Sequence, residues 1–256
     1  KFQGAIPKIF EQIKSQRKEV KNEMLALKQQ YEKTQDKSLL HKISAADNLQ
    51  MALKIAINSA YGALGNKGFR FYNPNIAESI TIVGQYALKI IEQKLDARLA
   101  KIFKVDPATK FVIYCDTDSV FFEMKSVVEK YYPDTPTDKI VKAMEKIAVD
   151  ILQREVDELM KEVTANCNAY KKTLYFKLEN VGSKGLWIKK KKYFVRVHSS
   201  EGVTYAKPKM KVMGIDLVKS STPHYIREKL RPTLDLLFDS DEAHIQSYIA
   251  AARTDF

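Results

Sequence analysis

Residues 111–124 read FVIYCDTDSVFFEM, two apolar runs joined by a short acidic turn. Each run is short and rich in β-branched and aromatic side chains, so the segment predicts a β-hairpin. The runs are apolar on both faces, which indicates two buried strands. Asp116 and Asp118 would then lie beside a low-dielectric core, where carboxylates persist only if they are paired or bound to a metal.

Two interpretations of this turn follow from the residues alone. Carboxylate oxygens suit hard cations such as magnesium, which makes the pair a candidate metal site. Aspartate is also a common turn residue, so an ordinary exposed hairpin turn explains the same letters. A calcium loop of the EF-hand type is excluded, because the positions that need glycine and glutamate hold Phe121 and Val127.

Composition limits the class of protein. The chain has 256 residues, of which 45% are hydrophobic, so it can form one large domain or a few small ones. Its formal charge of +12, from 43 Lys and Arg against 31 Asp and Glu, favours a polyanionic partner. Cys115 and Cys167 are too few for a disulfide framework and lack metal-ligand spacing, which favours a reducing compartment.

The sequence gives no sign of a membrane segment or a signal peptide. No apolar run approaches the ~20 residues of a membrane span, and the start KFQGAIPK lacks an apolar stretch. The first residue is not methionine, and the last residues AARTDF follow an amphipathic segment closely. We therefore expect the chain to be cut or processed from something longer.

The first quarter of the chain predicts two long helices. Residues 4–34 repeat apolar side chains at about 3.6-residue spacing and carry a basic outer face. A polar connection at 34–39 follows, and helical periodicity returns over 44–66. Residues 1–65 are therefore predicted to form an antiparallel helical hairpin.

The remaining pattern mixes helices and strands. It predicts an extended segment at 69–72 and helices at 73–99 and 135–170. Strands follow at 174–182 and 191–207, around a loop at 182–190. The last part predicts a helix in 220–230, with Thr222 as cap and Pro223 at its first position, and a short helix from about Asp241. The order of helical hairpin, mixed body and helical tail predicts the α+β fold class.

A second group of polar residues lies on the helical hairpin. Lys54, Asn58 and Tyr61 are spaced i, i+4 and i+7, so a cation, an amide and an aromatic ring share one helical face. Gly62 and Gly65 follow and allow a backbone or a flat ligand to approach closely.

The other helix of the hairpin carries Arg17 and Lys21, four residues apart, a cationic stripe suited to phosphate oxygens. Each stripe alone is also explained as a solvated helix face. Together they describe a site for a ligand with phosphates at one end and a flat ring at the other.

Five ordered segments resemble motifs of the family B DNA polymerases, in the phage replicative branch. The segment KIAINSAYGALGN resembles the motif K-x-x-x-N-S-x-Y-G, and YCDTDSVFFEM resembles Y-x-D-T-D-S. The others are QRKEVKN, which resembles the triphosphate-holding segment, LENVGSKGLWIKKKKY, which resembles the primer-gripping K-K-x-Y segment, and PKMKVMGIDLVKSSTP, which resembles the crossing from palm to thumb. The resemblance spans essentially residues 8–230, although the run between Arg17 and Lys54 is short for the phage branch.

The resemblance implies a division into three parts. It implies fingers at residues 1–65, a palm lacking its upstream strand at 66–214, and the start of a thumb at 215–256. The expected palm is an antiparallel sheet packed by helices, and the expected thumb is a partial helical one.

The resemblance also implies roles for particular residues. The implied catalytic residues are Asp118, Asp116 and Glu179, and the implied metal ligands are Asp118, bound to both ions, and Asp116 as an accessory carboxylate. The implied nucleotide-binding residues are Arg17, Lys21, Lys54, Asn58 and Tyr61. The implied DNA-binding residues are Gly62, Lys190, Lys191, Lys192 and Tyr193. A merely solvated edge also explains the lysine run when it is read alone.

The activity implied is template-directed DNA polymerisation from dNTPs on a DNA primer-template, with two Mg²⁺ ions or Mn²⁺ in their place. Polymerases of this family take a second aspartate from a D-x-x-S-L-Y-P segment, which this sequence does not contain. We therefore expect a fragment or split subunit that is inactive alone and needs a second polypeptide or N-terminal region carrying that aspartate and an exonuclease. No membrane partner is expected, and a phage-encoded chain would act in the cytoplasm of the infected cell.

Two other functions are compatible with parts of the pattern. A non-catalytic DNA-binding subunit would keep the motifs by descent, and it predicts that Asp118 can be lost freely. A magnesium-dependent nuclease would use the same carboxylates. The nuclease is disfavoured because its chemistry has no use for Lys54, Asn58 and Tyr61 on one helix.

Overall fold

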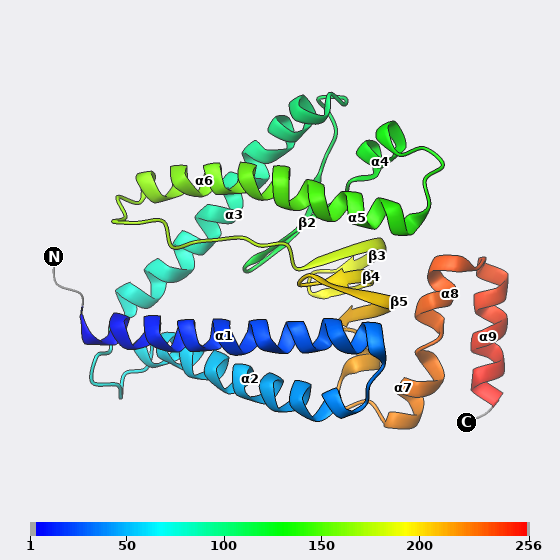
Figure 1. Ribbon diagram of the computed structural model, residues 1–256, viewed down its shortest axis with the longest axis horizontal. Coiled ribbons are helices and arrows are strands. Elements are labelled where there is room, and N and C mark those ends of the chain that lie inside the picture. The colour runs from blue at the N-terminus through cyan, green and yellow to red at the C-terminus, as the bar shows by residue number, and fades with distance from the viewer. Residues whose placement is uncertain (1–3, 255–256) are drawn as a thin grey trace.

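The computed structural model describes residues 4–254. It begins with the predicted helical hairpin, formed by α1 (Ala5–Thr34) and α2 (Ser38–Leu64), which pack along each other (Figure 1). The first helix ends at Gln35, whose left-handed backbone (φ 54°) lets its N–H bond to the Tyr31 carbonyl oxygen at 2.8 Å. Asp36 then accepts 2.8 Å hydrogen bonds from both the N–H and the hydroxyl of Ser38, which starts α2. These bonds lower the pKa of Asp36.

The long helix α3 (Pro74–Phe103) follows a compact turn. Asn73 caps it by accepting the Ile76 N–H at 3.2 Å, and Pro74 occupies the first position, where no N–H is needed. The prediction of an extended segment at 69–72 is wrong, because the Phe69 carbonyl oxygen accepts the Tyr72 N–H at 2.9 Å and folds these residues into turns.

The predicted β-hairpin is confirmed as β1 (Val112–Asp116) and β2 (Ser119–Phe122), paired antiparallel with Asp116 opposite Ser119. The expectation of strands buried on both faces is wrong. Most of their side chains are half-buried, and Ile113 is exposed. Within residues 4–254 no further strand pairs with these two, so both outer edges of the hairpin lack a partner strand.

The predicted helical stretch at 135–170 contains α5 (Thr137–Ile147), a π-helical turn (Ala148–Leu152) and α6 (Gln153–Asn166), after the short α4 (Lys125–Tyr131). These helices pack with α3 and β1 around the main core. The fully buried side chains there are Ile91, Leu95, Leu99, Phe111, Leu159 and Met160.

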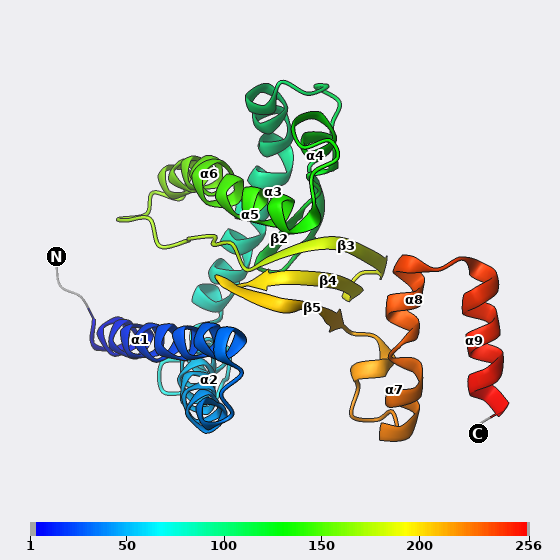
Figure 2. The ribbon, with the colours of Figure 1, turned by 45° about the vertical axis from the view of Figure 1, so that its right-hand side comes forward.

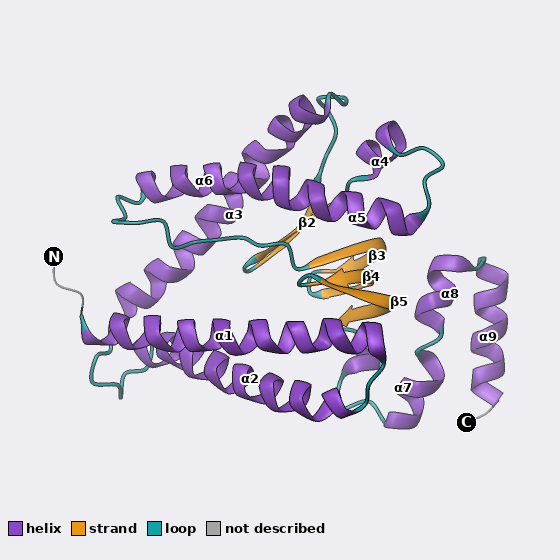
Figure 3. Cartoon of the chain, in the orientation of Figure 1, coloured by secondary structure: helices purple, strands orange, loops and turns teal. Residues whose placement is uncertain are grey.

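A separate three-stranded antiparallel sheet consists of β3 (Asn180–Lys189), β4 (Lys192–Ser200) and β5 (Val203–Met213) in that order (Figure 3). The predicted loop at 182–190 is therefore wrong, since nearly all of it is strand β3. The predicted strand at 174–182 is also wrong over 174–179, which pairs with no strand of the described chain.

Glycine explains the misplaced strand. A Cβ on Gly182 would lie 2.8 Å from the Arg196 carbonyl oxygen of β4, so this position needs glycine inside a strand. Sequence patterns interpret glycine as a sign of a loop, but here it permits close contact between two strands.

The C-terminal tail consists of a 3₁₀ turn (Asp216–Val218), α7 (His224–Leu230), α8 (Thr233–Asp239) and α9 (Glu242–Thr254). The prediction of Thr222 as cap and Pro223 as first helical residue is wrong. Pro223 itself holds the N-cap position with an extended backbone, and no side chain caps α7. The short helix expected near Asp241 is confirmed as α9, whereas α8 was not predicted.

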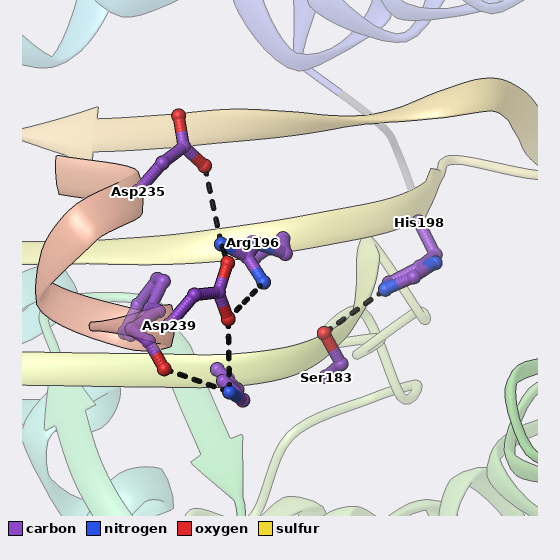
Figure 4. A network of polar contacts seen from close by, with 7 residues as sticks. Ser183, Arg196, His198, Asp235 and Asp239 are labelled. Atoms are coloured by element: carbon purple, nitrogen blue, oxygen red, sulfur yellow. Dashed lines mark hydrogen bonds and ion pairs between the residues drawn. The ribbon is translucent and has the colours of Figure 1, made fainter. Parts of the chain in front are cut away.

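Helix α8 is fixed to the three-stranded sheet by an arginine of β4 (Figure 4). The Arg196 guanidinium donates to Asp235 at 3.2 Å and to Asp239 at 3.0 Å, and Lys184 of β3 also donates to Asp239 at 3.1 Å. The same guanidinium lies 5.2 Å from the Phe238 ring centroid. Charge and aromatic contact thus join the tail to the sheet.

Helices lie against both edge strands of the three-stranded sheet. Helix α5 contacts β3 at one edge, and the last turns of α1, through Gln29 and Glu32, contact β5 at the other (Figure 2). The observed mixture of helices and antiparallel strands confirms the α+β fold class. None of the described helices is long and apolar enough to cross a membrane.

Candidate functional site

The acidic turn, residues 116–119, presents two different carboxylates. Thr117 adopts a left-handed backbone (φ 54°), and the Asp118 N–H bonds to the Asp116 carbonyl oxygen at 2.6 Å. The Asp116 carboxylate accepts the Thr117 hydroxyl at 3.0 Å, and its side chain is only 20% exposed. Asp118 is exposed, and its carboxylate has no hydrogen bond or ion pair with any other residue of the described range. In this turn the Asp116 carboxylate therefore already has partners, and the Asp118 carboxylate has none among the described residues.

The basic turn, residues 190–191 between β3 and β4, lies against the acidic turn. The Lys191 ammonium is 3.6 Å from Asp116 Oδ1. The Lys191 backbone N–H donates a 2.8 Å hydrogen bond to the Tyr114 hydroxyl oxygen on β1. Two contacts of one residue thus hold the lysine run beside the aspartates, although 77 residues separate Lys191 from Tyr114 in the chain.

An aromatic cluster, formed by Tyr114, Phe121, Trp187 and Tyr193, joins the two sheets below these turns. The Tyr193 ring centroid lies 5.8 Å from that of Tyr114 and 5.2 Å from that of Phe121. Trp187 and Tyr193 stack with centroids 6.0 Å apart. Such pairs contribute about 0.5–1.5 kcal/mol each beyond the burial of their area. The cluster fixes the sheet of the lysines relative to the sheet of the aspartates.

Tyr193 and Glu179 belong to the same neighbourhood. The pKa of Tyr193 is raised, first by burial and then by the nearby Tyr114, Asp116 and Glu179. Glu179 is exposed, and its carbonyl oxygen accepts the Glu201 N–H at 2.6 Å. Asp116 and Glu179 are thus both close enough to Tyr193 to affect its pKa, and Lys191 lies beside Asp116.

The other lysines of the run lie beside this group. Lys190 is exposed and Lys192 is half-buried. A Cβ on Gly214 would meet Lys192 Cγ at 3.5 Å, so the end of β5 lies directly under this part of the run.

The cationic stripe on α1 is engaged with other parts of the chain. Arg17 donates to the Gln50 side-chain oxygen of α2 at 3.3 Å, and its Nε atom is buried with no partner among the described residues. Lys21 forms a close ion pair with Glu201 in the turn between β4 and β5. Both cations are half-buried rather than fully solvated.

The polar face on α2 is mostly open. Lys54, Asn58, Tyr61 and Gly62 are all exposed, and a Cβ on Gly62 would meet nothing within 4 Å. The Tyr61 hydroxyl lies 2.9 Å from the Thr81 hydroxyl of α3. No hydrogen bond or ion pair joins this face to the acidic turn among the residues that the structure describes, so the structure does not link the two predicted groups directly.

The donor chemistry of the acidic turn suits a divalent cation only in part. Two carboxylates provide the oxygen ligands that magnesium prefers. Within the described chain, however, no group of three or more His, Cys, Asp or Glu side chains has the spacing of a metal site. The turn can therefore contribute ligands to a metal site that other groups complete.

Comparison with known proteins identifies the family. The family model for DNA polymerase family B matches residues 1–255. The chain therefore belongs to DNA polymerase family B.

Two of the most similar relatives are phage proteins. The DNA-directed DNA polymerase of Escherichia phage RB69 is 31% identical over 84% of this chain and 26% of its own length, and that of Enterobacteria phage T4 is 31% identical over 79% and 24%. The DNA polymerase alpha catalytic subunit of Leishmania donovani is 29% identical over 84% of this chain and 13% of its own length. The chain thus spans about a quarter of the length of the phage relatives.

Sequence reasoning assigned no role to Tyr114, Phe121, Trp187 or Gly214, although all four lie within the quoted motif segments. One signal was available, because Tyr114 and Asp116 are two apart on a strand and so share a face. The other residues make contacts between two sheets, and such contacts cannot be predicted from the periodicity of the sequence.

Proposed function

We propose that this chain supplies the fingers (residues 1–65), the later part of the palm (66–214) and the start of the thumb (215–256) of a template-directed DNA polymerase. The reaction is attack of the primer 3′-hydroxyl on the α-phosphorus of a dNTP, with release of pyrophosphate. The observation that carries this proposal is the exposed Asp118 carboxylate, which has no partner among residues 4–254, beside an Asp116 that forms an ion pair with Lys191. Membership of DNA polymerase family B supports it.

Asp118 would hold both Mg²⁺ ions, or Mn²⁺ in their place, with Asp116 as a weaker ligand. When bound, the two ions would activate the primer hydroxyl and neutralise the leaving pyrophosphate. Asp116 is the accessory carboxylate because Oδ1 already faces Thr117 and Lys191. Glu179, close enough to affect Tyr193, would be the third acidic group near the primer end.

The exposed face of α2 and the stripe on α1 would bind the incoming nucleotide. The triphosphate needs cations and the nascent base pair needs a flat floor. The residues proposed to hold the triphosphate are Arg17, Lys21 and Lys54, and those proposed to line the floor are Asn58 and Tyr61.

Nucleotide binding requires the Arg17 and Lys21 side chains to exchange their present partners in this proposal. Arg17 is bonded to Gln50 and Lys21 to Glu201 in the described conformation. A triphosphate would replace the neutral Gln50 acceptor of Arg17 with a charge-assisted hydrogen bond, which is roughly twice as strong as one between neutral groups. At Lys21 it would exchange one anionic partner, Glu201, for another.

The basic turn and its neighbours would grip the primer strand. Phosphate contacts position DNA without reading sequence, so a cluster of lysines at a fixed turn suits this role. The residues proposed to contact DNA are Gly62, Lys190, Lys191, Lys192 and Tyr193.

The second bridging aspartate would come from a further segment. The sequence contains no D-x-x-S-L-Y-P stretch, and the phage relatives are about four times as long as the part this chain matches. We infer that an additional region, in the same or a second polypeptide, supplies that aspartate and an exonuclease. Similarity to phage proteins supports the cytoplasm of an infected cell as the place of action.

Primer extension tests this proposal. The purified 256-residue chain is incubated with primer-template, Mg²⁺ and four dNTPs, alone and with a polypeptide carrying the upstream palm segment. Extension is expected only in the mixture, because losing one of two bridging carboxylates leaves the metal pair poorly held. Extension by the chain alone would contradict the ligand count, and DNA binding without extension in the mixture would favour a non-catalytic subunit.

A further inference from the structure

Tyr114 occupies the junction between the acidic and basic turns. Its side chain shares one face of β1 with Asp116, because the two residues are two apart on a strand. Its ring packs against Tyr193, with centroids 5.8 Å apart, and its hydroxyl oxygen accepts the Lys191 N–H at 2.8 Å. A side chain of the acidic hairpin therefore touches both the basic turn, at Lys191, and strand β4, at Tyr193.

The Lys191 backbone is held from two directions. Its φ of 62° is a left-handed conformation that is uncommon for a lysine. A Cβ on Gly214 would lie 2.0 Å from the Lys191 carbonyl oxygen, so the end of β5 lies directly under the turn. Tyr114 holds the N–H side of the same residue. Between these contacts the ammonium is directed to within 3.6 Å of Asp116 Oδ1.

We propose that Tyr114 is a positioning residue, whose hydroxyl sets the place of the Lys191 ammonium and thereby its contact with a primer-strand phosphate. This inference rests on the proposed polymerase function. The ammonium is on a flexible side chain that is 64% exposed, so its location depends on where the backbone of the turn lies. A displaced turn would leave the net charge unchanged but move the ammonium away from the phosphate.

The hydroxyl and the ring of Tyr114 have separable roles. The ring belongs to the aromatic cluster and contributes packing, which Tyr114→Phe keeps. Only the hydroxyl oxygen meets Lys191, so the phenylalanine variant removes the positioning contact alone. Tyr131→Phe is the matched control, because the Tyr131 hydroxyl also bonds a backbone group, the Phe103 carbonyl oxygen at 2.7 Å, from helix α4 outside the site.

The first measurement needs no DNA. Amide hydrogen exchange in the 256-residue chain should be faster at Lys191 in Tyr114→Phe than in the wild type, and unchanged there in Tyr131→Phe. Unchanged exchange at Lys191 in Tyr114→Phe would overturn the proposal, because the hydroxyl would then not restrain the turn.

The second measurement is the dissociation constant of the full chain for a primer-template as salt rises. Lys191→Ala should lower the slope of log affinity against log salt by about 0.9, the value for one lost phosphate contact. Tyr114→Phe should weaken binding about threefold to tenfold, lower the slope toward that of Lys191→Ala, and add nothing in the Lys191→Ala background. Tyr131→Phe should match the wild type.

The outcomes separate this inference from the proposed function. An unchanged slope in Tyr114→Phe, or full additivity with Lys191→Ala, would show that Tyr114 acts through general stability and would overturn the positioning role. Wild-type binding that is absent or insensitive to salt would instead contradict the proposed grip on DNA, and with it the inference.

Discussion

Replacing Gly214 by alanine should destabilise the chain far more than the same change at Gly202. Both glycines have a positive φ, +65° and +84°, so alanine at either position carries a backbone strain of about 1–2 kcal/mol. Only Gly214 also has a neighbour in the way, since its Cβ would lie 2.0 Å from the Lys191 carbonyl oxygen, whereas nothing lies within 4 Å at Gly202. Moving backbone to relieve such a clash costs a further ~1–3 kcal/mol.

Urea unfolding of the two variants measures this difference. A difference of ~2 kcal/mol between Gly214→Ala and Gly202→Ala corresponds to a gap of about 1 M between their midpoints, for a denaturant slope of ~2 kcal/mol per M. Equal midpoint shifts in the two variants would refute the reasoning, because they would show that the end of β5 does not press on the basic turn.

Three other results are expected. The pKa of Asp239 is lowered to about 2, chiefly by its hydrogen bond from Arg196, so the stability that this carboxylate contributes is present above pH ~4 and is lost as the pH falls toward 2. The melting temperatures of the wild type and of Asp239→Asn should therefore converge over that range. A constant difference between them would contradict the ion pair. Tyr61→Ala in the reconstituted enzyme should raise misinsertion relative to correct insertion, measured by single-nucleotide kinetics, whereas an equal fall in both rates would make Tyr61 a structural residue. Lys191→Ala with Lys192→Ala should reduce the salt dependence of primer-template binding without changing sequence preference, and an unchanged slope in a salt titration would exclude these lysines as phosphate contacts.

The sequence predicted the parts of the fold that depend on local periodicity. The helical hairpin and the β-hairpin at the acidic turn follow from apolar spacing and turn residues. Strand β3 was missed because Gly182 and Gly185 resemble loop residues. In the structure Gly182 lets β3 approach β4 closely, and Gly185 leaves room for the Trp187 ring on the same strand. The π-helical turn within the long helical stretch also has no sequence signature that we used.

The candidate site was predictable only in its composition. The motifs named the acidic and basic residues, but the contacts that join them lie between segments far apart in the chain. The hydrogen bond from Lys191 to Tyr114 and the stacking of Trp187 on Tyr193 are examples. Periodicity describes one element at a time, so it cannot show which faces of two sheets meet. It also did not predict that Lys21 is paired with Glu201, because that pair depends on how α1 lies against β5.

The central claim is that Asp118 is the carboxylate through which this chain takes part in nucleotidyl transfer. Its most direct test is the single-turnover rate of one correct nucleotide insertion, measured with the chain and the polypeptide that carries the second aspartate, as Mg²⁺ is varied. Asp118→Asn keeps the size of the side chain and removes its charge, and Asp150→Asn, at an exposed aspartate of the π-helical turn, is the matched control. We expect Asp118→Asn to lower the rate by about a hundredfold or more at every Mg²⁺ concentration, and Asp150→Asn to leave it unchanged. Equal rates for the wild type and Asp118→Asn would contradict the claim.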